Sequence, residues 1–213
     1  MNTLEIITLS MGTAWASGIN LYAAVFMLGY MGATGNVDLP PDLEILTNPL
    51  VMAAAGFMYA VEFFADKVPG VDSVWDSLHT FIRIPAGAML AAGAVGELGA
   101  GAELAAMLVG GTLTTATHAT KSGSRVLINA SPEPFTNWVA SVTEDVAVIG
   151  GLWAALIHPW LFVALLVAFI LLLVWLLPKI WRGIKFVFAK IRSLFGGNKP
   201  ESPNPDPDPP AQT

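Results

Sequence analysis

Residues 160–177 read WLFVALLVAFILLLVWLL, an unbroken run of apolar side chains without a charge. A run of this length spans the hydrocarbon core of a bilayer as a single helix. The whole chain agrees, because 54% of its 213 residues are hydrophobic and only 12% are charged. Soluble domains carry about twice that share of charged residues. The composition therefore predicts an all-α integral membrane protein.

Outward from this run, the apolar blocks predict a polytopic bundle of about six transmembrane helices. Lysine and arginine beside membrane spans favour the cytoplasmic side. With six spans, every basic residue lies on or near that side if both termini are cytoplasmic, which is the topology we expect. The predicted spans cover residues 4–31 and 49–64, two spans within 83–118 that turn at the glycine-rich stretch 96–103, and residues 138–157 and 160–177.

The sequence divides into three regions. Residues 1–178 form the predicted transmembrane bundle, and residues 198–213 form a proline-rich acidic tail that we expect to be disordered. Between them, residues 179–197 combine an apolar stripe with basic side chains, which predicts an interfacial helix on anionic lipid headgroups. The alternative is that this segment continues the sixth span into the cytoplasm.

Two polar hairpins between the spans hold every lysine and arginine that precedes the C-terminal region. They are VEFFADKVPGVDSVWDSLHTFIRIPAG (residues 61–87) and THATKSGSRVLINASPEPFTNWVASVTED (residues 117–145). Spacings of three and four residues place side chains on one face of a helix. Such a face is predicted in the first hairpin for Asp72, Asp76, His79 and Arg83, and in the second for His118, Lys121 and Arg125. In a transporter both hairpins would fold partly into the bundle, and the sequence leaves open whether they are re-entrant.

Charges at membrane depth cost several kcal/mol each unless they are paired or hydrated, so they tend to occur where function or helix pairing requires them. We interpret Lys67 and Glu133 as charges of the headgroup region. The candidate substrate- or ion-binding residues are Asn20, Glu62, Asp66, Asp72, Asp76, His79, Arg83, His118, Lys121, Arg125, Glu144 and Asp145.

The ligand class stays open at this point. Carboxylates outnumber basic residues in the hairpins, which suits a proton or cation, whereas Arg83, Lys121 and Arg125 could hold an anionic solute. The sequence lacks metal-binding, nucleophile-elbow, phosphate-loop and dinucleotide motifs, so we predict no metal, cofactor or catalytic residue. The net charge of -6 argues against nucleic acid as a partner.

The hairpins also carry a family resemblance. ADKVPGVDSVWDSLHTFIR (65–83), HATKSGSRVLINASPEPFTNW (118–138), SVTED (141–145) and GINLYA (18–23) resemble a family of bacterial and plastid membrane proteins, domain of unknown function 4126. The resemblance covers about residues 18–181. It implies a helical membrane fold but no activity. We expect a multi-pass protein of a bacterial inner (plasma) membrane.

Three functions fit these observations. The leading hypothesis is a small transporter, permease or flippase-like protein whose two hairpins form the site, and it requires Glu62, Arg83 and Glu144 to converge. The alternatives are a membrane-embedded enzyme acting on a lipid head or phosphorylated intermediate, and a non-catalytic assembly protein. Small residues such as Ala14 and Gly18 permit close helix packing within one protomer or in a homo-oligomer.

Overall fold

The computed structural model describes residues 1–130 and 134–195, and every regular element in this part of the chain is helical, which confirms the all-α prediction. Glu133 and the predicted tail lie outside the described residues. The elements are α1 (Thr3–Ala33), the 3-10 helix η1 (Pro41–Thr47), α2 (Pro49–Ala65), α3 (Val71–Gly93), the 3-10 helix η2 (Gly96–Leu98), α4 (Ala100–Asn129), α5 (Pro134–Ile157) and α6 (Pro159–Phe195).

Several of these helices are suited to a membrane. In the described chain α1, α5 and α6 are long and apolar enough to span one, and the pair η1 and α2, bent by 69°, makes a fourth if it counts as one span. The remaining long helices, α3 and α4, carry charged residues such as Arg83 and Lys121 along their length. The structure thus supports a membrane protein but does not confirm six spans.

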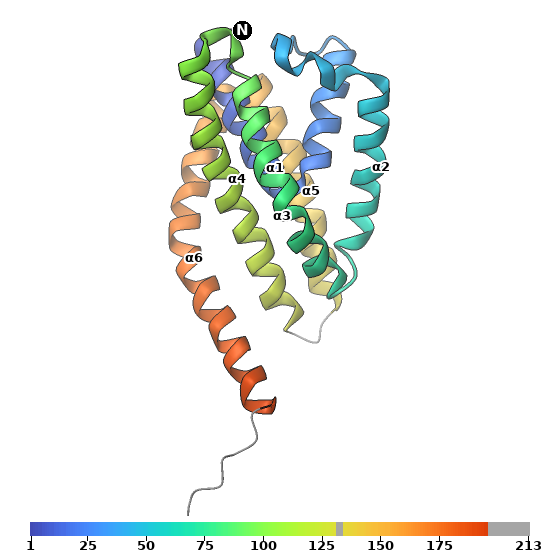
Figure 1. Ribbon diagram of the computed structural model, residues 1–213, viewed down its shortest axis with the longest axis vertical. Coiled ribbons are helices and arrows are strands. Elements are labelled where there is room, and N and C mark those ends of the chain that lie inside the picture. Colours follow the sequence, from blue (N-terminus) through green and yellow to red (C-terminus); the bar gives the residue numbers. More distant parts are fainter. Residues whose placement is uncertain (131–133, 196–213) are drawn as a thin grey trace, which may run out of the picture.

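The helix α1 turns back on itself at Asn20, whose backbone leaves the helical region with φ -147° and ψ 97°. Figure 1 shows the two limbs, residues 3–19 and 21–33, both reaching the upper end of the bundle. At 1.5 Å per residue, the limbs measure only about 26 and 20 Å. The first predicted span therefore consists of two short limbs that fold back on each other as a helical hairpin.

Contacts along α5 establish this reversal independently. On the first limb, the Thr8 hydroxyl donates to the Ala155 carbonyl oxygen over 3.0 Å. On the second limb, Met31 lines one cavity together with Ile157, two residues further along α5. Residues 8 and 31 of α1 thus lie beside the same end of α5, whereas Asn20 bonds to Asp145 three turns away.

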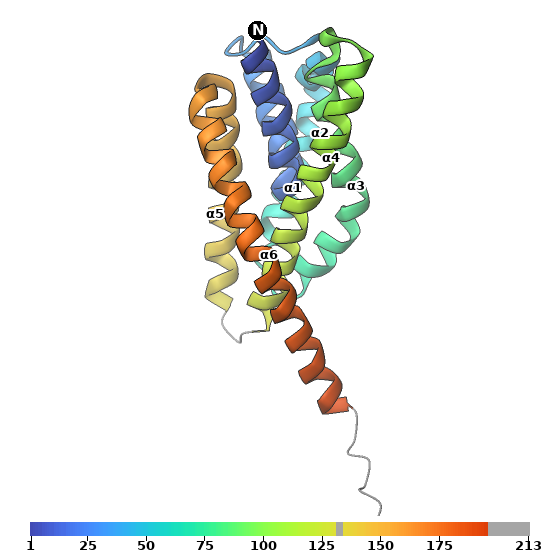
Figure 2. The same cartoon turned by 90° about the vertical axis from the view of Figure 1, so that its left-hand side faces the viewer.

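This reversal changes the topology. Helices α2 to α6 run from one end of the bundle to the other, so α1 begins at the upper end and α6 ends at the lower end (Figures 1 and 2). The structure thus places Thr3 and Phe195 at opposite ends of the bundle, whereas six full spans would place them at the same end; the side of the membrane on which the termini lie stays a prediction. The polar hairpins lie at the lower ends of α2 with α3 and of α4 with α5.

The bend of α1 has a local cause in the sequence GIN (residues 18–20). Asn20 begins the second limb as its N-cap, since its Oδ1 accepts a hydrogen bond of 3.0 Å from the Ala23 amide. Gly18 allows the tip to approach α4, because a Cβ there would lie 2.7 Å from the Thr114 carbonyl oxygen. Thr114 in turn donates to the Ala14 carbonyl over 2.8 Å.

No break separates the sixth predicted span from the basic segment, because α6 continues through Pro178 to Phe195. Ile180 is buried against Gly123, and Gly183 lies beside Leu127, so α6 packs on α4 past the predicted boundary. This geometry is that of the alternative in which the segment continues the span. Its contact with anionic lipid stays a prediction.

The reversal can be tested because the chain has no cysteine. We expect single cysteines at the exposed positions Thr3 and Asp38 to react with an impermeant thiol reagent from one side of the membrane, and a cysteine at Ser193 to react from the other. The measurement is mass-tag labelling in sealed vesicles of known orientation. A continuous first span would instead place Thr3 and Ser193 on the same side.

Candidate functional site

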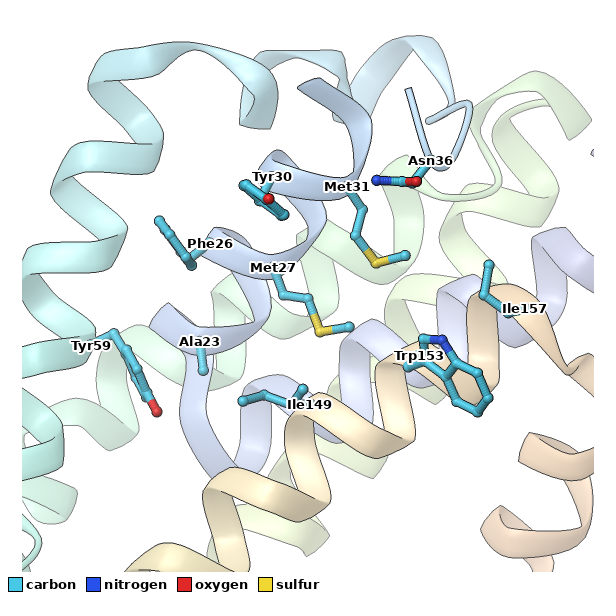
Figure 3. Close-up of a pocket in the computed structure, with 10 residues that line it drawn as sticks. All are labelled: Ala23, Phe26, Met27, Tyr30, Met31, Asn36, Tyr59, Ile149, Trp153 and Ile157. Atoms are coloured by element: carbon cyan, nitrogen blue, oxygen red, sulfur yellow. The ribbon is translucent and has the colours of Figure 1, made fainter. Parts of the chain in front are cut away.

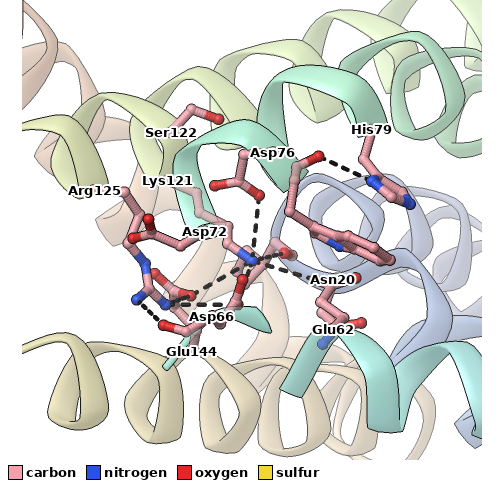
Figure 4. A network of polar contacts seen from close by, with 12 residues as sticks. Asn20, Glu62, Asp66, Asp72, Asp76, His79, Lys121, Ser122, Arg125 and Glu144 are labelled. Atoms are coloured by element: carbon pink, nitrogen blue, oxygen red, sulfur yellow. Dashed lines mark hydrogen bonds and ion pairs between the residues drawn. The ribbon is translucent and has the colours of Figure 1, made fainter. Parts of the chain in front are cut away.

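The ammonium group of Lys121 lies at the centre of a buried cluster of oxygens, which we call the Lys121 cage (Figure 4). Lys121 belongs to α4, and every oxygen in the cage comes from another helix. The oxygens around Nζ are the Ile19 carbonyl of α1 at 3.0 Å, Glu62 Oε1 at 3.2 Å and Asp66 Oδ2 at 2.8 Å from α2, Asp76 Oδ1 of α3 at 3.7 Å and Glu144 Oε2 of α5 at 3.6 Å.

Two fully buried arginines flank the cage and share its carboxylates. Arg83 pairs with Glu62 over 2.5 Å and with Asp76 over 3.0 Å. Arg125 pairs with Glu144 over 2.6 Å and also donates to the Asp66 backbone carbonyl over 2.9 Å. The convergence of Glu62, Arg83 and Glu144 that the transporter hypothesis requires is therefore present.

Helical spacing explains how single helices deliver these groups. Glu62 and Asp66 are four residues apart at the C-terminal end of α2, and Asp76 and Arg83 are two turns apart on α3. Likewise, Lys121 and Arg125 lie one turn apart on α4, so both face the cage. Each helix thus places two charges on its inner face.

The bend of α1 completes the cage electrostatically. The first limb ends at Ile19, whose backbone carbonyl is buried and accepts a hydrogen bond from Lys121, and the second limb begins at Asn20. A helix end carries partial negative charge at its C-terminus and partial positive charge at its N-terminus. The Lys121 ammonium binds the Ile19 carbonyl at the C-terminal end of the first limb. Asp145 accepts a 3.2 Å hydrogen bond from Asn20 at the N-terminal end of the second limb. Each limb therefore meets a side chain of opposite charge.

A second polar layer links the cage to the lower turn. Asp72 in the first turn of α3 accepts a 2.6 Å hydrogen bond from the Ser73 amide, and Asn129 donates to its Oδ1 over 2.7 Å. Asn137 donates to Asn129 over 2.8 Å. The sequence interpretation missed Asn129 and Asn137, which lie inside the quoted second hairpin but carry no charge.

The two histidines differ in their relation to the cage. His118 contacts it, since its Nδ1 lies 3.5 Å from Arg83 NH1 and its Nε2 lies 2.7 Å from the Thr80 hydroxyl. His79 lies apart, stacked on Trp75 at 4.1 Å with its Nε2 3.1 Å from the Tyr22 hydroxyl. Within the described chain, neither imidazole forms a hydrogen bond to a carboxylate.

Lys67 is part of the protein interior. Its side chain is only 6% exposed, and its Nζ donates to the Phe63 carbonyl over 2.9 Å and to the Ser141 hydroxyl over 3.1 Å. The ammonium also lies over the Phe63 ring. Its predicted depth in the headgroup region stays a prediction.

Carboxylates outnumber basic side chains in this interior. Six carboxylates (Glu62, Asp66, Asp72, Asp76, Glu144 and Asp145) face four cations (Lys67, Arg83, Lys121 and Arg125). Among the described side chains, four buried carboxylate oxygens accept no hydrogen bond: Glu62 Oε2, Asp66 Oδ1, Asp76 Oδ2 and Asp145 Oδ2. No set of three acidic or histidine side chains in the described residues is arranged to hold a metal ion.

A largely apolar cavity of about 590 Å³ approaches the site from the upper end (Figure 3). It lies between the second limb of α1, α2 and α5. Ala23, Tyr59 and Ile149 are among its lining residues. Each of these residues is one helical turn from a polar residue of the site, namely Asn20, Glu62 and Asp145 respectively.

Fold and site together define a helical membrane protein with a buried ion-pair centre. Residues 7–179 match the family described as Domain of unknown function (DUF4126), and the chain belongs to this family. No curated protein and no solved structure matches the chain. The binding role of the predicted site residues therefore stays a prediction.

The contribution of the cage to stability can be measured at Arg83. Replacement Arg83→Gln leaves Glu62 and Asp76 buried with fewer cations, and breaking a buried pair in this way costs about 3–5 kcal/mol. We expect a loss of this size in the free energy of unfolding, followed by tryptophan fluorescence. The control Arg182→Gln alters an exposed position and should cost less than about 1 kcal/mol. Equal losses in the two variants would contradict a stabilising cage.

Proposed function

We propose that the protein is a multi-pass membrane transporter that moves protons or monovalent cations through the Lys121 cage. In this proposal α2 to α6 cross the bilayer and α1 enters it from the upper side and returns. The lower end is cytoplasmic because it carries the basic residues of α6, such as Arg182 and Lys185, and a bacterial inner membrane is the proposed location.

The observation that carries the proposal is the imbalance between acceptors and donors in the interior. All three basic side chains that could bind an anion are already engaged, because Arg83, Lys121 and Arg125 each contact two or more carboxylates. Arg83 and Arg125 each retain one unpaired donor, Nε, but four carboxylate oxygens of the interior are unpaired and six carboxylates face four cations. This excess of acceptors and of negative charge favours a cation over an anion.

The interrupted helix supports transport in particular. Backbone that is not helical at membrane depth is tolerated where it is buried in protein or lines a water-filled cavity. Transporters place such broken helices at their ion sites, where the ends of half-helices contact the ion. In this chain, the break at Asn20 places one half-helix end on Lys121 and the other on Asp145.

A scaffold is the second candidate function, and one observation favours it. Eight ion pairs connect the cage residues, and such a network by itself holds α2, α3, α4 and α5 together. In a non-catalytic assembly protein the same network would serve only helix packing. In that case, replacing the carboxylates would lower the stability of the protein but would not change ion flux.

Ion flux separates these two functions. Purified protein in liposomes should dissipate an imposed proton or potassium gradient faster than protein-free liposomes, as followed with an enclosed fluorescent indicator. Replacement Asp145→Asn removes a buried carboxylate one helical turn from Ile149 of the cavity and should reduce the rate to about a tenth or less, because intramembrane carboxylates carry proton and ion paths.

The matched control is Glu97→Gln, which removes an exposed carboxylate of η2 at the upper end. We expect wild-type flux from this variant. If wild-type liposomes are as tight as protein-free liposomes to both ions, the transport proposal is wrong and the scaffold remains.

A further inference from the structure

We infer that the Lys121 cage is a binding site for a free monovalent cation of ammonium size, and that the Lys121 side chain occupies this site as a tethered competitor in the conformation described. The inference rests on the proposed function for its biological meaning, but its geometry stands independently. It assigns Lys121 to closing the site, whereas the carboxylates bind the ligand.

The first observation is the coordination of the ammonium nitrogen. Five oxygens from four helices surround Nζ at distances between 2.8 and 3.7 Å. Ligand distances to magnesium are about 2.0–2.1 Å and those to calcium about 2.3–2.6 Å. The cage is thus expanded relative to a divalent metal site. Three of its oxygens lie at 2.8–3.2 Å, the distance of an ammonium hydrogen bond, and the other two lie at 3.6 and 3.7 Å as ion-pair partners.

The second observation is the set of unpaired oxygens in the wall of the cage. Glu62 and Asp76 are fully buried, and each has one carboxylate oxygen paired with a cation and one without a hydrogen-bond partner. Without the Lys121 charge, four carboxylates would share two arginines. The cage therefore retains a strong preference for a cation when the tether is absent.

Lysine is also the chemically suitable tether. Its ammonium is a compact point charge on a flexible stem, whereas the planar fork of arginine is fixed by paired hydrogen bonds. Arg83 uses its two terminal nitrogens to bridge Glu62 and Asp76, and Arg125 uses them to bridge Glu144 and the Asp66 carbonyl. Lys121 contacts α1, α2, α3 and α5 through one nitrogen atom. Rotation of one side chain is then sufficient to exchange the tethered cation for a free one.

Chemical rescue tests the inference on the full chain in detergent micelles. Lys121→Ala should lower the midpoint of thermal unfolding. Added ethylammonium should raise that midpoint by about 5–10 °C at a concentration about 100 times its dissociation constant. The reference is an equal concentration of choline chloride, whose cation is too large for the cage. Wild-type protein, with the site already filled, should show no difference between the two salts.

Lys67→Ala provides the matched control, because Lys67 is equally buried but forms no ion pair with a carboxylate within 4.0 Å in the described structure. Its midpoint should not respond specifically to ethylammonium. Equal responses of the two variants, or no response of Lys121→Ala, would overturn the inference. If Lys121→Ala does not fold, the double variant Lys121→Ala/Glu144→Gln takes its place, because it removes one charge of each sign and so keeps the net charge of the cage. The same specific rise of its unfolding midpoint in ethylammonium is expected.

The rescue does not depend on transport. Specific rescue together with tight wild-type liposomes would retain the cation site and reject the transport function. Flux without rescue would retain the transport function and reject the role of Lys121 as a tethered cation.

Discussion

The contact between the Lys121 ammonium and its surrounding oxygens constrains nearly every helix of the protein. Lys121 belongs to α4, and the cage receives oxygens from α1, α2, α3 and α5. A buried ion of this kind is tolerated only when enough partners compensate for its lost hydration. The helices that supply these partners must therefore all pass close to the Lys121 ammonium. Helix α6 packs against α4 just below, at Gly123.

The bend in α1 follows from the same constraint. A helix that crossed the bilayer without interruption would satisfy its own carbonyl groups and offer none to Lys121. Breaking the helix at Asn20 exposes the Ile19 carbonyl, and the small residue Gly18 brings that carbonyl close to α4. The cost of the break is offset by the Asn20 cap and by the charges at both half-helix ends.

Periodicity predicted the inner faces of α3 and α4 because a spacing of three or four residues has the same meaning in any helix. It could not predict the reversal of α1, since hydropathy measures how apolar a segment is and not whether the chain returns. Residues 4–31 are apolar enough for one span, and the two limbs are distinguished only by tertiary contacts, such as those of Thr8 and Met31 with the same end of α5. The burial of Lys67 also depended on partners distant in sequence, such as Ser141.

The reversal of α1 leaves the order of the other helices unchanged. Helices α2 to α6 alternate in direction between the two ends of the bundle, and α1 packs against them through its two limbs and its tip. Lys121 holds the tip through the Ile19 carbonyl, and Asp145 holds it through Asn20. The bend of α1 and the buried charges therefore share their contacts and form one polar centre.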